Sequence, residues 1–169
     1  MTPRIVLIGP PGAGKSFIGS ALSRKLKMGF ADTDTLIEED QGKSVSQIFI
    51  DDGEETFRAI EQRICLSAFE KEDGILALGG GAVLDPITRA ALVQLGSEVI
   101  FLDVSLKVAA PRIGFNRDRP LLLNNPRQKW QELMDNRRPI YEEVSTLHYQ
   151  TGDQSVAEVV RDLALKVKV

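Results

Sequence analysis

Eight consecutive residues near the amino terminus have the types and the spacing that bind a nucleotide. Residues 9–16 read GPPGAGKS and fit the pattern G-x-x-x-x-G-K-[ST] in full. Glycines let the backbone turn its N–H groups inward around phosphate, the lysine reaches the β- and γ-phosphates, and the serine hydroxyl ligates Mg²⁺. The residues expected to contact the nucleotide here are Gly12, Ala13, Gly14, Lys15, Ser16 and Phe17.

Such a loop has to lie between a buried strand and a helix whose amino end faces the phosphates. Residues 4–8 form an apolar run that predicts the strand, and residues 16–27 predict the helix, with Ile18, Leu22 and Leu26 along one face. The helix dipole would then favour the bound anion. This context favours a nucleotide-binding P-loop over a glycine-rich turn without a ligand.

Two carboxylates follow the P-loop helix. Residues 30–34 predict a short strand that ends in Asp32 and Asp34, and a spacing of two in an extended chain places both side chains on one face. The carboxyl ends of parallel strands line the ligand crevice of such a sheet, so the pair is expected beside the P-loop. For Asp34 alone, capping of a helix at residues 35–40 is an equally good interpretation.

Further along, an arginine–glutamate pair and a run of glycines are candidates for binding a second ligand. Arg58 and Glu61 lie three apart on a predicted helix after Gly53, a spacing more often explained by a solvated ion pair. The apolar strand at residues 75–78 leads into three glycines at residues 79–81, which permit close approach of backbone to a ligand.

A rival metal carboxylate is Asp103, which ends the apolar strand at residues 99–103. Any buried parallel strand followed by a cap has that pattern, so we choose Asp32, which closes the first strand after the P-loop helix.

Residues 114–122 form a basic segment between helices that is rich in Gly, Asn and Pro. A mobile lid over phosphates and a solvated loop explain this segment equally well.

Composition and charge exclude several classes. The 169 residues predict one globular domain, 43% hydrophobic and 27% charged, without an apolar run long enough to span a membrane. A net charge of −3 argues against a nucleic-acid partner. The strand near the amino terminus leaves no room for a signal peptide, and the single cysteine, Cys65, is expected to be a buried structural thiol, so we expect a cytoplasmic protein. His148 and Trp130 are expected to be structural.

Taken together, these pieces resemble the shikimate kinase family over residues 4–165. The resemblance rests on the P-loop, Asp32-Thr33-Asp34, GExxFRxxE from Gly53, LGGG from Leu78, RPLL from Arg119 and RxPxY from Arg137. It implies an α/β P-loop NTPase fold: a three-layer α/β/α sandwich with a five-stranded parallel sheet of order 2-3-1-4-5 and a mobile lid. On this basis residues 1–169 form one kinase domain, with the lid at about 112–124 and substrate-binding helices at about 33–61.

The same resemblance implies the reaction and the residue roles. A monomeric, cytoplasmic enzyme would transfer the γ-phosphoryl group of ATP to the 3-hydroxyl of shikimate, with Mg²⁺, in aromatic amino acid biosynthesis. Ser16 would ligate the metal, and Asp32 would reach it through water. Lys15, Asp34 and Arg119 would be catalytic, with Asp34 as the candidate base and Arg119 closing from the lid. Shikimate would be bound by Asp34, Arg58, Gly80 and Arg137, and adenine would be stacked by Arg112.

Three features depart from the family pattern. Phe17 stands where the family commonly has threonine and is expected to change packing behind the P-loop. Pro111 replaces a commonly polar or basic residue, and the loop at residues 152–156 is unusual.

The rival interpretations are a gluconate-type kinase and a non-catalytic nucleotide-binding module. The glycine run with two arginines argues against the first, and retention of Asp34 and both arginines argues against the second. No N-K-x-D guanine motif occurs, which disfavours a GTPase.

Overall fold

The computed structural model describes residues 2–113 and 125–169, within which five parallel strands form one sheet of order β2-β3-β1-β4-β5. This order confirms the fold expected from the resemblance. Most of the expected lid, including Arg119, lies outside the described residues. The strands are β1 (Pro3–Ile8), β2 (Phe30–Asp32), β3 (Gly74–Ala77), β4 (Glu98–Asp103) and β5 (Leu147–Gln150).

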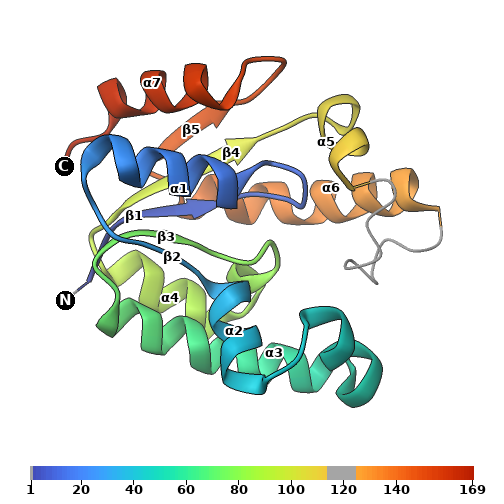
Figure 1. Cartoon of the computed structure of the whole chain (residues 1–169). Coiled ribbons are helices and arrows are strands. Elements are labelled where there is room, and N and C mark those ends of the chain that lie inside the picture. The colour runs from blue at the N-terminus through green and yellow to red at the C-terminus, as the bar shows by residue number, and fades with distance from the viewer. Residues whose placement is uncertain (1, 114–124) are drawn as a thin grey trace.

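Helices cover both faces of the sheet (Figure 1). On one face α1 (Lys15–Leu26) packs against α7 (Val156–Lys166), and on the other lie α3 (Val45–Lys71), α4 (Pro86–Gln94) and α6 (Pro126–Val144). The remaining short helices are α2 (Thr33–Gln41), the 3₁₀ helix η1 (Ala82–Leu84) and α5 (Leu106–Ile113). Because both faces of the sheet are covered, its central strands are continuous apolar runs.

The core follows from those runs. In β1 the side chains of Ile5, Val6, Leu7 and Ile8 are at most 1% exposed, and they belong to one cluster that extends to both helical layers. A separate small cluster of Ile37, Ile48, Phe57 and Ile64 joins α2 to α3. This second cluster holds the helices that carry the expected substrate residues.

Local signals explain where most helices begin. Asp85 caps α4, with Pro86 at its first position, and Ser155 and Glu158 form a capping box at α7. In α3, Gly53 has φ 84° and ψ 171°, so the helix is broken there and a helical segment follows Gly53, as expected from the sequence. Among the described residues, none of the helices has the length and apolar character needed to cross a bilayer.

The strand expected at residues 30–34 is wrong in one respect. The strand β2 ends at Asp32 rather than Asp34, and Asp34 lies in the first turn of α2. The cap of α2 is Asp32, whose carboxylate accepts the Asp34 N–H at 2.9 Å. The two carboxylates therefore do not share the face of an extended chain. They meet because a capped helix turn returns the chain to the same edge of the sheet.

Candidate active site

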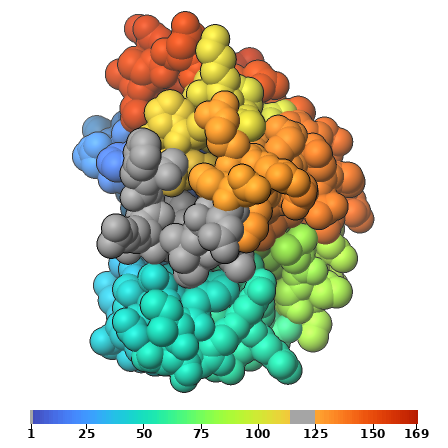
Figure 2. All heavy atoms as spheres, turned by 90° about the vertical axis from the view of Figure 1, so that its right-hand side faces the viewer, coloured from blue at the N-terminus to red at the C-terminus, as the bar shows by residue number. Residues whose placement is uncertain are grey.

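A cleft of about 370 Å³ opens at the carboxyl ends of the strands. Figure 2 views the molecule from this edge, with α3 (teal) at the bottom and α7 (red) at the top. The cleft brings together the P-loop, the carboxylates of Asp32 and Asp34, the glycine run and the loop before α7. Its lining includes Gly12, Ala13, Gly14, Lys15, Ser16, Phe17, Asp32, Asp34, Gly79, Gly80, Arg112, Thr151, Gly152, Gln154 and Val156.

The P-loop is held by contacts to its own backbone and to distant helices. Lys15 Nζ donates to the carbonyl oxygens of Gly9, at 2.8 Å, and Pro10, at 3.2 Å. Arg112 donates to the Gly12 carbonyl at 2.9 Å, and the Trp130 indole donates to the Pro11 carbonyl at 2.8 Å. The lysine ammonium thus lies inside the loop, where it could contact the phosphates of a bound nucleotide.

Ser16 and Asp32 form the part of the cleft that suits a divalent cation. The Ser16 hydroxyl donates to one carboxylate oxygen of Asp32, while the other accepts the Asp34 N–H. A hydroxyl and a carboxylate at a phosphate loop are hard oxygen donors, and Mg²⁺ is commonly held by one or two such groups together with phosphates and water. The donor set therefore fits Mg²⁺. The described residues contain no cluster of three or more His, Cys, Asp or Glu side chains suited to a metal.

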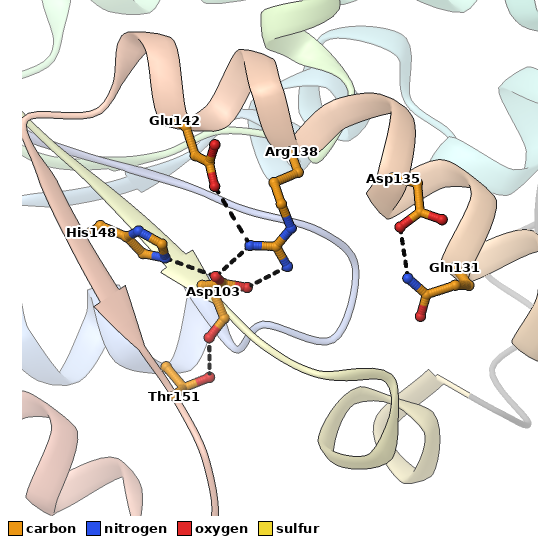
Figure 3. A network of polar contacts seen from close by, with 7 residues as sticks. All are labelled: Asp103, Gln131, Asp135, Arg138, Glu142, His148 and Thr151. Atoms are coloured by element: carbon orange, nitrogen blue, oxygen red, sulfur yellow. Dashed lines mark hydrogen bonds and ion pairs between the residues drawn. The ribbon is translucent and has the colours of Figure 1, made fainter.

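Asp103 lies in a different environment. Its carboxylate accepts two hydrogen bonds from Arg138, at 2.6 and 2.9 Å, and one contact from His148 Nε2 at 2.7 Å (Figure 3). Burial alone would raise the pKa of Asp103, but the bonds from Arg138 and His148 outweigh it and lower that pKa. The His148 ring stacks on Phe101 with centroids 4.8 Å apart, in agreement with a structural role.

The three glycines after β3 are surrounded by four charged side chains. A methyl group on Gly79 would lie 2.8 Å from Asp34 Oδ1 and 2.9 Å from Glu61 Oε2. On Gly80 it would lie 3.2 Å from Arg137 Nη1, and on Gly81 2.5 Å from Arg58 Nη1. A side chain at any of the three positions would therefore push against one of these charged groups, and Asp34, Arg58 and Arg137 all lie at this one turn.

Glu61 is the partner that organises this cluster. Arg58 Nη1 donates to Glu61 at 2.8 Å. The Glu61 side chain is only 5% exposed and that of Arg58 is 27% exposed, so the pair is partly buried. Burial raises the pKa of Glu61, and the charges of Arg58 and Arg137 oppose that rise. Glu61 therefore holds one guanidinium beside the glycine turn at the expense of its own hydration.

Several expected residues differ from the sequence interpretation. Phe17 is 77% exposed and lines the cleft, so it does not pack behind the P-loop. Arg58 and Arg137 adjoin the glycine turn but do not line the 370 Å³ cleft. Cys65 is buried, as expected, and burial raises the pKa of its thiol.

Sequence reasoning missed three supporting residues. Thr33, fully buried, accepts the Gly79 N–H at 2.9 Å through its hydroxyl. Tyr141 donates to the Gly80 carbonyl at 2.5 Å. Trp130, which is expected from the sequence only to pack, donates its indole N–H to the Pro11 carbonyl. Tyr141 lies in the RxPxY motif and Thr33 lies between Asp32 and Asp34, so both stand in motifs that the resemblance uses, whereas Trp130 stands in none of them.

Comparisons with known proteins agree with this geometry. The model of the family described as shikimate kinase matches residues 11–168. A shikimate kinase of Rhodococcus jostii is 44% identical over 168 residues, which is 99% of each chain. A shikimate kinase from Acinetobacter baumannii, solved in complex with shikimate, is 30% identical with a TM-score of 0.93 over 98% of this chain and 92% of that one. The Aquifex aeolicus enzyme is 32% identical with a TM-score of 0.82 over 96% and 94% of the two chains.

Proposed function

Because the chain belongs to the shikimate kinase family, we propose that its cleft transfers the γ-phosphoryl group of ATP to the 3-hydroxyl of shikimate, giving shikimate 3-phosphate and ADP. One observation carries the proposal: the side chains of Asp34, Arg58, Glu61 and Arg137 converge on the glycine turn, which lies beside the P-loop. An ATP-dependent kinase needs an acceptor site beside its phosphate loop, and the convergence of these charged side chains supports such a site here.

The nucleotide binds along the P-loop. Residues 12–17 offer backbone N–H groups and the positive end of α1 to the phosphates, and Lys15 exchanges its loop carbonyls for phosphate oxygens. Arg112 stacks on adenine from α5. Ser16 holds Mg²⁺ directly and Asp32 holds it through water, and the metal neutralises phosphate charge when bound.

The acid binds at the glycine turn. Arg58 and Arg137 offer planar guanidinium groups, which match a carboxylate with paired N–H bonds, and Gly80 offers backbone to a ring hydroxyl. Asp34 receives the proton of the attacking hydroxyl. Arg119, which lies in the proposed lid at residues 112–124, meets the transferred phosphoryl group.

An ADP-release assay tests the reaction with shikimate, quinate and gluconate side by side. We expect Mg²⁺-dependent ADP release with shikimate and little with the other two acids. Lys15→Ala should abolish the release, which shows that it comes from this site. Equal or greater turnover with gluconate would contradict the assignment.

We also propose that the enzyme is a monomer of the cytoplasm, in one domain spanning residues 1–169, and binds neither nucleic acid nor membranes. The net charge of −3 supports the last point, because nucleic-acid and anionic-lipid surfaces attract basic proteins. Light scattering at assay concentration would test the monomer.

A further inference from the structure

Helix α6 presents two buried aromatic side chains to backbone carbonyls of the active site. The Trp130 indole N–H donates to the Pro11 carbonyl at 2.8 Å, and the Tyr141 hydroxyl donates to the Gly80 carbonyl at 2.5 Å. Each side chain belongs to a residue that is 1% exposed. Eleven residues, about three helical turns, separate the two, so both lie on one face of α6.

The two carbonyls belong to segments that touch each other. A methyl group on Gly80 would lie 3.4 Å from the Gly9 carbonyl oxygen and 3.4 Å from Pro11 Cδ. The P-loop and the glycine turn are therefore close neighbours, and α6 bonds to both. Arg137, on the same face of α6, faces Gly80 from between the two aromatic anchors.

Hydrogen bonds fix the peptide groups of the glycine turn one after another. Thr33 accepts the Gly79 N–H, and the Gly79 carbonyl accepts the Ala82 N–H at 3.1 Å. Since the C=O and N–H of a trans peptide point in opposite directions, that bond turns the Gly80 N–H away from η1. The next peptide is held by Tyr141 through the Gly80 carbonyl.

We propose that Tyr141 and Trp130 are positioning residues that keep the acid site and the nucleotide loop in register through α6. Tyr141 holds the Gly80 backbone in the orientation that receives a hydroxyl of the acid, and Trp130 holds the P-loop beside it. The inference rests on the proposed assignment of Gly80 to the substrate. Burial keeps Tyr141 a donor, because it raises the pKa of the phenol against the opposing effect of Arg137.

Tyr141→Phe removes one oxygen and keeps the ring packed on Phe101, whose centroid is 5.1 Å away. We expect the KM for shikimate to rise about three- to tenfold, from the loss of the bond to Gly80 and of the contact with Arg137, while the Kd for ATP stays unchanged. Tyr149→Phe is the matched control, because its hydroxyl bonds to Asp162 away from the cleft. That variant should keep both constants. Wild-type constants in Tyr141→Phe would overturn the role of Tyr141.

Trp130 is the single tryptophan of the chain, so an isosteric analogue can be placed at this position alone. Incorporation of β-(3-benzothienyl)alanine replaces the indole N–H by sulfur and keeps the shape of the ring. We expect the KM for ATP to rise about three- to tenfold, with shikimate binding in the absence of nucleotide unchanged. A shikimate defect with normal ATP binding would contradict the assigned role.

Amide hydrogen exchange supplies a readout that needs no activity. Well below the melting temperature of each variant, exchange should quicken locally at residues 79–82 in Tyr141→Phe and at residues 9–14 in the analogue protein. Exchange and KM values equal to those of the wild type would refute the positioning roles even if shikimate is the substrate. If the wild type fails to phosphorylate shikimate, the substrate proposal falls, and the exchange data still decide whether α6 orders the two loops.

Discussion

Arg138 donates two hydrogen bonds to Asp103 (Figure 3). The residue before it, Arg137, faces Gly80 instead. Successive residues on a helix point about 100° apart, so one arginine holds the end of β4 while its neighbour faces the glycine turn. Thr151, at the entrance to the loop before α7, also bonds to the Asp103 carbonyl, through its N–H at 2.7 Å and its hydroxyl at 3.1 Å. Asp103 thus ties β4 to α6, β5 and that loop.

The first prediction separates the two carboxylates that compete for the metal. Asp32→Asn should lower Mg²⁺-dependent turnover about a hundredfold or more, because it removes the charge beside Ser16. Asp103→Asn should keep most activity and lose about 1.5–3 kcal/mol of unfolding free energy, because it breaks bonds to a charged partner. Turnover over a Mg²⁺ titration and denaturant melts measure both. The reverse pattern would assign the metal to Asp103.

The second prediction concerns acid stability. The pKa of Asp103 is lowered in the folded protein, since the bonds from Arg138 and His148 outweigh burial; Glu142 also lies near Arg138, at 3.9 Å. A carboxyl with a lowered folded pKa stabilises above its unfolded value, about 3.9, and that contribution disappears as pH falls through the folded pKa. The stability gap between wild type and Asp103→Asn should therefore be full at pH 6 and shrink below about pH 4.

Asp135→Asn supplies the control for both experiments. Asp135 lies on α6, the helix of Arg138, and accepts a hydrogen bond from Gln131 at 2.8 Å on an exposed face. Its replacement should change unfolding free energy by less than about 0.5 kcal/mol at any pH between 3 and 7. A gap for Asp103→Asn that stays constant with pH would mean that the Asp103 charge contributes nothing to the fold.

How far the sequence predicts this molecule depends on how local each signal is. The P-loop, the apolar strands and the Gly53 break are encoded within a few residues, and all three are found where expected. The Asp34 prediction failed because strand and capped helix compete over residues 32–34, and the cap formed by Asp32 decides between them. Resemblance, not periodicity, supplied the strand order.

The contacts that were missed join residues far apart in the chain. Thr33 bonds to Gly79, and Trp130 bonds to Pro11 across 119 positions. A buried hydroxyl or indole gives no sign in the sequence of which carbonyl it will meet, because the partner is set by how helices pack on the sheet. Arg58 and Glu61 illustrate the same limit: their spacing predicts a pair, but only the fold shows that Glu61 is buried.

The third prediction tests the carboxylate clamp. Arg58→Lys and Arg137→Lys should each raise the shikimate KM about ten- to a hundredfold at constant charge, because lysine cannot give paired bonds to a carboxylate. ATP affinity should stay within twofold, roughly the noise of such assays. Arg63→Lys is the matched control on α3, since Arg63 pairs with Asp40 on the outer side. An ATP defect with normal shikimate binding would move that arginine to the phosphate side.

The fourth prediction uses the close approach of Gly81 to Arg58. A methyl group there would lie 2.5 and 2.7 Å from the two terminal nitrogens of Arg58, which are the far end of a flexible side chain. Gly81→Ala should therefore fold but displace the guanidinium, raising the shikimate KM about tenfold, the loss of one charged hydrogen bond. Gly42→Ala, where the space is open but φ is +68°, should lose stability and keep both KM values.

A double variant tests whether Gly81 acts through Arg58. If it does, Gly81→Ala combined with Arg58→Ala should raise the shikimate KM no more than Arg58→Ala alone. Additive defects in that double variant would show that the glycine is required for another reason.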